Sequence, residues 1–158
     1  MPVIQLTTEI AAPIDICFDL SRSIDLHKYS MKHTNEEAVA GRTSGLIEDG
    51  ETVTWQAKHL GVTQYLSSKI SNFKRPFIFR DSQTKGIFDF YHHDHIFEEK
   101  NGKVVLIDIF EYKSPFGIFG VIADMLYVKK YMIKLLQQRN KVIKEFAESD
   151  KWKSILSR

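Results

Sequence analysis

Histidines crowd the stretch FDFYHHDHIFEEKNG, residues 88–102, which holds half of the six histidines in the chain. His92, His93 and His95 lie there with Asp94 among aromatic residues. Imidazole nitrogens and carboxylate oxygens ligate transition metals, and a histidine paired with a carboxylate can act as a general acid or base. The same groups can sense pH, or they can satisfy one another's hydrogen bonds inside a strand. The secondary-structure elements that position these residues determine which of the four interpretations fits.

The alternation of side chains along a strand divides this cluster into two sets, because neighbouring residues point to opposite faces. The two sets are Tyr91, His93, His95 and Phe97 on one face, and Phe90, His92, Asp94 and Ile96 on the other. Asp108 lies in the next strand-like segment, KVVLIDIFEY, which follows a predicted tight turn at Asn101 and Gly102. Both sets include apolar residues, so alternation alone does not establish which of them faces the core.

The predicted order of elements is one strand, two short helices, about six antiparallel strands and one long helix. Residues 3–10 alternate as a strand does, and apolar residues recur at helical spacing after Pro13. The strand-like segments that follow are EEAVAG, GLIEDG, ETVTWQAKH, VTQYLSSKISNF, FIFRDS, IFDFYHHDHIFEE and KVVLIDIFEY. Residues 118–146 then repeat apolar side chains at spacings of three and four. A helix of this length can cover one face of a curved antiparallel sheet, so the sequence predicts an α+β fold with about seven strands in total.

The composition is that of one folded domain over residues 1–158, with 43% hydrophobic and 27% charged residues. The net charge of +2 comes from scattered basic residues without a nucleic-acid-reading motif, so no nucleic-acid partner is expected. The single cysteine, Cys17, excludes an internal disulfide and favours the cytoplasm. The most apolar run, PFGIFGVIADMLYV, contains Asp124 and is shorter than the ~20 residues that span a bilayer, so no stable membrane insertion is expected.

Three longer stretches carry a resemblance to a known family: GLIEDGETVTWQAKHLGVTQYLSSKI (45–70), RPFIFRDSQTKGIFDFYHHDHIF (75–97) and IDIFEYKSPFGIFG (107–120). Together they resemble the START-like, or SRPBCC, superfamily, and in particular its bacterial branch labelled cell division inhibitor-like or polyketide cyclase/dehydrase-like. That branch shows a similar Val-Thr-Trp-x-Ala-x-His-x-Gly run and a similar His-x-His-x-Phe. The resemblance covers nearly the whole chain and implies the helix-grip fold, in which a curved sheet wraps around the C-terminal helix. It also implies an apolar cavity between the two, and no cofactor.

The resemblance further implies that the set with His93 and His95 faces the cavity, because this set contains the His-x-His-x-Phe run. Asp108 on the neighbouring strand is then expected to point the same way, while His92 and Asp94 face solvent. The predicted ligand-binding residues are Trp55, His59, Phe79, Asp81, Phe88, Tyr91, His93, His95, Phe97, Asp108 and Phe110.

These expectations favour a carrier or sensor that binds a small apolar, amphipathic or lipid-like molecule without catalysis. One alternative is a cyclase- or dehydratase-like enzyme that uses His93, His95 and Asp108 for acid–base chemistry on a polyketide-like ligand. Another is a regulator that uses the START-like scaffold to contact a protein partner without any ligand. The inward histidines and aspartates can also simply pair with one another, since buried polar groups need partners.

Two smaller features leave further alternatives open. Two histidines at i and i+2 on a strand can share a metal ion, but this spacing is generic, so no metal is predicted. The loop KSPFGIFGV, residues 113–121, exposes apolar residues just before the long helix. This loop is expected to be a lid, an edge that touches a membrane, or a packed turn.

Overall fold

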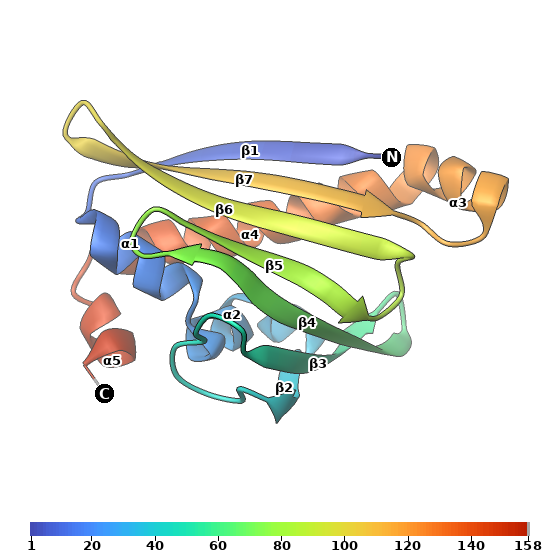
Figure 1. The fold of residues 1–158 in the computed structure, drawn as a ribbon, viewed down its shortest axis with the longest axis horizontal. Helices are drawn as coiled ribbons and strands as arrows, with labels where there is room; N and C mark the ends of the chain where they lie inside the picture. The colour runs from blue at the N-terminus through green and yellow to red at the C-terminus, as the bar shows by residue number, and fades with distance from the viewer. Residues whose placement is uncertain (158) are drawn as a thin grey trace.

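The computed structural model describes residues 1–157, and in this range one seven-stranded sheet curves around a long helical segment (Figure 1). The first half contains β1 (Val3–Ile10), α1 (Ile14–Ser21), α2 (Ile24–Ser30), η1 (Lys32–Thr34), β2 (Glu37–Gly41), β3 (Thr52–His59) and β4 (Val62–Lys74). The second half contains β5 (Ile78–Lys85), β6 (Phe90–Lys100), β7 (Lys103–Lys113), α3 (Gly117–Ala123), η2 (Asp124–Val128), α4 (Lys129–Ala147) and α5 (Trp152–Leu156). The predicted α+β helix-grip fold is confirmed.

The strands pair in the order β1-β7-β6-β5-β4-β3-β2, and every pair is antiparallel. Tight turns join two of the hairpins. Asn101 and Gly102, with φ of 53° and 75°, connect β6 to β7, and Leu60 and Gly61, with φ of 54° and 78°, connect β3 to β4. Positive φ at both central residues is what a type I′ turn requires, and its twist matches the right-handed twist of the strands. The hairpins therefore fix the register that brings β6 and β7 together.

The predicted strand in GLIEDG is wrong. In this segment Leu46 forms only a single bridge with Ser23, and the chain turns at Gly45 and Gly50, whose φ values are 74° and 77°. Two glycines in the left-handed region within six residues interrupt an extended strand. Ser23 instead caps α2, where its hydroxyl accepts a hydrogen bond from the backbone N–H of Leu26 at 3.2 Å. The segment is a loop that packs against the start of α2.

The long C-terminal helix is confirmed, but it is not uniform. The helical segment runs from Gly117 to Ala147, and a π-helical turn, η2, separates α3 from α4. In Figure 1, α4 crosses behind the sheet while α3 projects past the end of β7. The short α5 was not predicted from the sequence. Within residues 1–157 no helix is long and apolar enough to cross a membrane.

The main core lies where α1 packs against the sheet and the last turns of α4. Phe18 is completely buried, and its ring centroid lies 5.3 Å from those of Phe79 and Phe97 and 5.4 Å from that of Phe73, each in an edge-to-face arrangement. Burial of one such side chain contributes about 1.5–3 kcal/mol. Cys17 is also fully buried here, and burial raises the pKa of its thiol to about 12.

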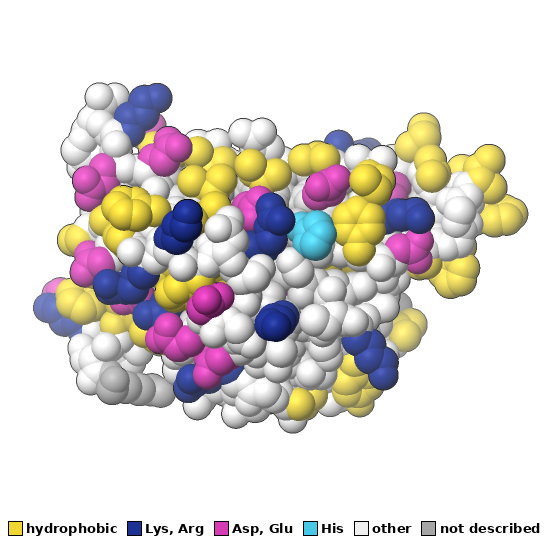
Figure 2. Space-filling view, in the orientation of Figure 1, with side chains coloured by type: hydrophobic (Ala, Val, Ile, Leu, Met, Phe, Trp, Pro, Cys, Tyr) yellow, Lys and Arg dark blue, Asp and Glu magenta, His cyan; other side chains and the backbone are white. Residues whose placement is uncertain are grey.

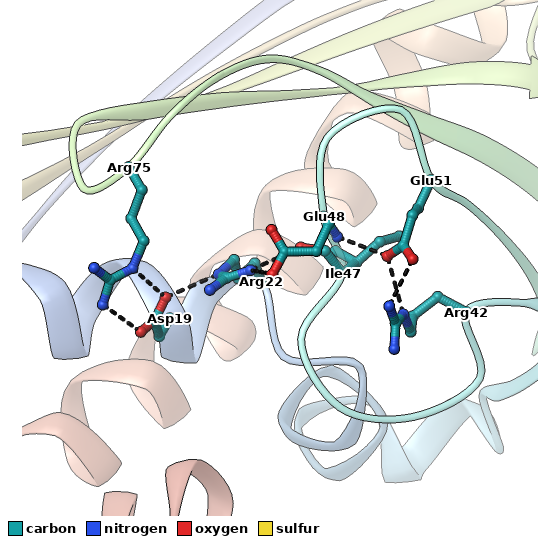
Figure 3. Close-up of polar contacts among 7 residues, drawn as sticks. All are labelled: Asp19, Arg22, Arg42, Ile47, Glu48, Glu51 and Arg75. Carbon is teal, nitrogen blue, oxygen red and sulfur yellow. Dashed lines mark hydrogen bonds and ion pairs between the residues drawn. The ribbon is translucent and has the colours of Figure 1, made fainter.

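A chain of charged side chains closes the outside of this end of the molecule (Figure 3). Arg75 donates two hydrogen bonds to Asp19, of 3.0 Å and 2.7 Å, and Arg22 donates a third, of 2.8 Å. Arg22 continues to the carbonyl of Ile47 at 3.2 Å and to Glu48 at 2.8 Å. Burial alone would raise the pKa of Asp19, but the hydrogen bonds from both arginines hold it below its usual range. The chain links α1, the turn before β5 and the loop before β3.

Candidate functional site

A cavity of about 1000 Å³ lies between the concave face of the sheet and the helical segment from α3 to α4. Apolar side chains such as Ile24, Val53, Leu66 and Met132 form most of its wall. The residues of the predicted site that line it are Trp55, His59, Phe79, Asp81, Phe88, Tyr91, His93, His95 and Phe110. They lie on β3, β5, β6, β7 and the turn before β6, and β4, which contributes Leu66, joins β3 to β5 in one continuous concave surface.

Two residues of the predicted site lie outside the cavity lining. Phe97 is 1% exposed and belongs to the main core, where it packs against Phe18. Asp108 is completely buried beneath His93 and His95. Both side chains point to the inner face, as alternation requires. However, Phe97 lies at the packed end of that face, and Asp108 is covered by larger side chains.

His93, His95 and Asp108 form the centre of a buried polar cluster. The Nε2 atom of His93 lies 2.8 Å from Oδ1 of Asp108, and Nδ1 of His95 lies 3.1 Å from the same oxygen. This grouping follows from register, because His95 pairs directly with Asp108 across β6 and β7, and His93 is two residues away on the same face. The Nδ1 of His95 is poorly aligned and has no hydrogen-bond partner within the described chain. The two imidazole rings are 3.9 Å apart.

Helix α4 completes the cluster from the other side of the core. Asn140 donates a hydrogen bond of 2.6 Å from Nδ2 to Oδ2 of Asp108. Arg139 lies with Nη1 3.7 Å from Oδ1 of Asp108 and donates from Nη2 to the carbonyl of Ser21 at 2.8 Å. Both α4 side chains are buried, at 6% and 3% exposure. Both oxygens of the carboxylate are therefore occupied, and its charge is balanced by the guanidinium.

Burial and partners set the ionisation of this cluster. Burial alone would raise the pKa of Asp108, but the hydrogen bond from His93 and the close approach of His95 hold it well below its usual range. Burial holds the pKa of His95 well below its usual value, and the nearby His93 and Arg139 lower it further. At neutral pH the cluster therefore contains a carboxylate, a guanidinium and a neutral His95. The charges of the carboxylate and the guanidinium offset each other in a low-dielectric interior, where an unpaired charge is costly.

The cluster has the composition of a metal site, but its charges oppose one. One ligand atom from each of His93, His95 and Asp108 lies within 4.8 Å of the others, and all three residues are buried. A bound zinc ion requires its ligands at about 2.0–2.3 Å. The guanidinium of Arg139, 3.7 Å from the same carboxylate oxygen, already supplies the positive charge. A divalent ion at this point would lie beside a fixed cation, which favours the metal-free network.

The other polar groups of the predicted site form separate pairs. The Nδ1 of His59 lies 2.7 Å from the hydroxyl of Tyr131, and Tyr91 donates its hydroxyl to Asp81 at 3.2 Å. Burial lowers the pKa of His59, and burial followed by the charge of Asp81 raises the pKa of Tyr91 well above its usual value. The predicted group of five inward histidines and aspartates is therefore divided into three parts of the cavity region.

His92 and Asp94 lie on the outer face, as expected. His92 is exposed and hydrogen-bonds to Ser82 at 2.8 Å. Asp94 accepts two hydrogen bonds from Arg80, of 2.6 Å and 2.7 Å, in a partly exposed ion pair. The dense appearance of the histidine stretch in the sequence thus comes from two unrelated arrangements on opposite faces of β6.

Sequence reasoning missed Arg139 and Asn140, although the sequence contains a signal for them. The apolar stripe of the long helix runs through Leu136 and Ile143, and Arg139 and Asn140 occupy the three- and four-residue positions between them. Polar residues inside an apolar stripe are buried when the helix packs, and buried polar groups need partners. The two polar residues within the apolar stripe therefore indicate a polar contact with the sheet.

Comparison with known proteins supports the fold. The sequence matches no protein-family model, and no curated protein is significantly similar to it in sequence. Among solved structures, the protein TTHA0849 from Thermus thermophilus matches with a TM-score of 0.74 and 20% identity, over 91% of this chain and 95% of that one. Major latex-like protein 151 from Panax ginseng matches with a TM-score of 0.69 and 11% identity, over 94% and 98%. Zhui aromatase/cyclase from Streptomyces sp. R1128 matches with a TM-score of 0.67 and 14% identity, over 93% of each chain.

These structures share the helix-grip architecture almost end to end. The low identities establish the fold and leave the chemistry to be argued from the residues of this chain. The fold agrees with the one that the START-like resemblance of the sequence implies.

Proposed function

We propose that the protein binds a small apolar or lipid-like molecule in the cavity between the sheet and α4, as a non-catalytic carrier or sensor in the cytoplasm. The observation that carries this proposal is the cavity itself, whose volume of about 1000 Å³ lies at the upper end of the range for small-molecule sites. A well-packed interior leaves few voids larger than a water molecule, so a space of this size needs an occupant. Its largely apolar wall favours a hydrocarbon or aromatic body.

The polar cluster suggests how the ligand is oriented. Arg139 lines the cavity and has five N–H donors, of which one bonds to Ser21 and one to Asn140, at 2.8 Å and 3.3 Å. His93 and His95 line the same cavity. These groups favour a ligand whose apolar body carries an oxygen-bearing head, such as a carbonyl or hydroxyl. The head accepts a hydrogen bond at the cluster while the body lies against the aromatic wall.

Binding is tested with a fluorescent fatty acid, cis-parinaric acid, in a titration against the wild-type protein and two variants. Ala57→Phe adds a large side chain to the cavity wall, where Ala57 is 6% exposed. Gln56→Phe makes a matched change on the outer face of the same strand. We expect Ala57→Phe to weaken binding at least tenfold and Gln56→Phe to leave it unchanged. Equal binding by all three proteins would show that the probe does not enter the cavity.

Native mass spectrometry of the protein purified from its host identifies what the cavity holds. We expect a mass increment that disappears on denaturation and is absent from Ala57→Phe. If the wild-type protein carries no such increment and cis-parinaric acid does not bind, the carrier proposal fails.

A second candidate function is supported by one contact. His93 lines the cavity and lies 2.8 Å from the buried Asp108, an arrangement that orients a general base toward a ligand. A cyclase- or dehydratase-like enzyme of the polyketide cyclase branch would use this pair to remove a proton next to a carbonyl. The test is hydrogen–deuterium exchange at the activated carbon of an aromatic β-diketone, followed by NMR. Exchange that requires His93 and is lost in His93→Gln supports catalysis, and a background rate in the wild type excludes it for this compound class.

A further inference from the structure

The segment from Phe116 to Tyr127, here called the apolar tip, exposes an unusual amount of hydrophobic surface. The exposed fractions of its most open side chains are Phe116 82%, Ile118 71%, Phe119 76%, Val121 58%, Met125 77% and Leu126 71%. Figure 2 shows hydrophobic side chains projecting from the end of the molecule where α3 lies in Figure 1. Contiguous apolar surface of this kind marks an interaction site in folded proteins.

Close packing at its base holds the apolar tip in place. Phe116 and Gly117 turn the chain with φ values of 70° and 54°. A Cβ atom at Gly120 would lie only 2.1 Å from the carbonyl oxygen of Pro115, so glycine is needed for this approach. Ser114 donates a hydrogen bond of 2.8 Å to the buried carboxylate of Asp124. The structure thus directs the apolar side chains outward from a defined turn.

Along the chain segment that carries the apolar tip, the exposed charges have one sign. Between Ser114 and Lys144 the only acidic residue is Asp124, which is 7% exposed and held by Ser114. Lys129 and Lys130 follow the tip directly, and both are exposed. The solvent-facing part of this segment therefore combines apolar side chains with lysines and exposes no carboxylate. At its base, the exposed carboxylate of Asp89 is paired with Lys113 at 3.3 Å. An anionic surface complements this pattern.

The distribution of the exposed side chains favours a lipid bilayer over a protein groove. The exposed α3 side chains are those of Ile118, Phe119, Val121, Ile122 and Ala123. At about 100° per residue they spread over more than half of the helix circumference. A groove in a partner protein covers one apolar stripe of a helix, whereas the bilayer interface surrounds an inserted tip. Because Phe119 and Tyr127 also line the cavity, the tip lies at the cavity wall.

We propose that the apolar tip docks reversibly on the surface of a membrane that contains anionic lipids. Apolar side chains enter the headgroup boundary, while Lys129 and Lys130 contact lipid phosphates. Docking in this way is peripheral and needs no membrane-spanning helix. It stands independently of whatever the cavity holds, although it places the cavity wall next to a source of apolar molecules.

Flotation with lipid vesicles tests the proposal. Vesicles of phosphatidylcholine alone are compared with vesicles that also contain phosphatidylglycerol, at low and high salt. We expect the wild-type protein to float at least tenfold more with the anionic vesicles, and the difference to shrink at high salt because surface charges are screened. No flotation with anionic vesicles at low salt would overturn the proposal.

One double variant and one control locate the contact. Ile118→Gln/Leu126→Gln changes tip residues that do not line the cavity and should reduce flotation at least tenfold. Phe77→Gln changes a side chain of similar exposure, 58%, at the turn before β5, and should leave flotation unchanged. If Ile118→Gln/Leu126→Gln floats like the wild type, the tip is not the contact.

A second pair of measurements separates lipid docking from self-association. Lys129→Gln/Lys130→Gln leaves the apolar side chains in place and should lower flotation only with anionic vesicles. Sedimentation velocity on the free protein should give a monomer. A dimer that Ile118→Gln/Leu126→Gln dissolves, together with no vesicle binding, would show that a second copy of the chain covers the tip and would overturn the lipid proposal.

Discussion

The two ends of the long helical segment are built in opposite ways. At the closed end, α1 packs against the last turns of α4, Phe18 is completely buried, and the Asp19–Arg22 ion pairs cover the outside. At the open end, α3 carries Phe119 with 76% of its surface exposed, and the cavity lies beside a smaller core cluster that includes Tyr112 and Leu136. The same residue type thus stabilises one end and remains available for contact at the other. Close packing and exposed apolar surface are therefore separated along one helical segment.

The buried polar cluster stands at the boundary between these ends. Arg139 lines the cavity, and it also donates to the carbonyl of Ser21 at the last residue of α1. Asn140 bonds both to Asp108 on β7 and to Thr8 on β1, at 2.6 Å and 3.3 Å. The cluster therefore connects the packed half of the molecule to the hollow half. Any ligand that contacts it also contacts the groups that hold α4 against the sheet.

The largest expected effect is on the free energy of unfolding when one phenylalanine from each end is replaced. Phe18→Ala removes a ring that contacts three others in the main core, and it should lower the free energy of unfolding by about 3–5 kcal/mol. Phe119→Ala removes an exposed ring and should change it by about 0.5 kcal/mol or less. Urea unfolding followed by circular dichroism measures both. Similar losses in the two variants would show that the apolar tip is part of the folded core.

The second-largest expected effect is the loss of stability when one of two carboxylates on neighbouring strands is replaced. Asp108→Asn leaves the buried charge of Arg139 without its partner and should cost about 3 kcal/mol of stability. Asp94→Asn weakens a partly exposed pair with Arg80 on the outer face and should cost about 1 kcal/mol or less. The same unfolding measurement applies. A loss of under about 1 kcal/mol in Asp108→Asn would mean that water reaches the cluster and replaces the carboxylate.

The smallest expected effect is a dependence of stability on pH that differs between the two histidine sites. The pKa of His95 is lower in the folded protein than in the unfolded chain, where it is near ~6.5. Below that pH the unfolded chain takes up a proton that the folded protein excludes, so stability falls as the pH falls. The expected slope approaches about 1.4 kcal/mol per pH unit. Asp108 adds a further loss at lower pH, as its carboxylate protonates on passing through its depressed folded pKa.

Two substitutions identify the source of that slope. His95→Gln should flatten most of the dependence between about pH 6.5 and pH 5, where histidines rather than carboxylates take up protons. His59→Gln, at the open end, should remove a smaller part of it, because His59 is only half-buried although burial also lowers its pKa. The free energy of unfolding of both variants, measured at a series of pH values, shows how much of the slope each histidine contributes. An unchanged slope in His95→Gln would mean that His95 is protonated in the folded protein.

Local patterns predicted most of the fold because they recur along the sequence. Alternation located β1, β3, β6 and β7, and Asn101–Gly102 located a hairpin whose turn has the expected positive φ values. Spacings of three and four located the helical segment, but they do not distinguish an α turn from the π turn at Asp124–Val128. The segment GLIEDG alternated over too few residues to outweigh its glycines.

The site was predicted only where the sheet alone determines it. Alternation and register place His93 beside Asp108, since both lie on strands that pair directly. The contacts of Asp108 with Arg139 and Asn140 come from a helix. The alternation of side chains along the strands therefore does not predict them. The position of Phe97 in the main core depends on how α1 meets the sheet, and no local pattern of β6 carries that information. Tertiary packing, not residue type, separates the cavity wall from the core.

The burial of Cys17 has a practical consequence for experiments on living or purified material. It is the only cysteine in the chain, it is completely buried, and its thiol has a pKa of about 12, so almost none of it is the reactive thiolate at neutral pH. A thiol reagent therefore has no accessible native target in the folded protein. One cysteine introduced on α3 can carry a fluorophore or spin label in the otherwise natural sequence, and its signal reports on the open end alone.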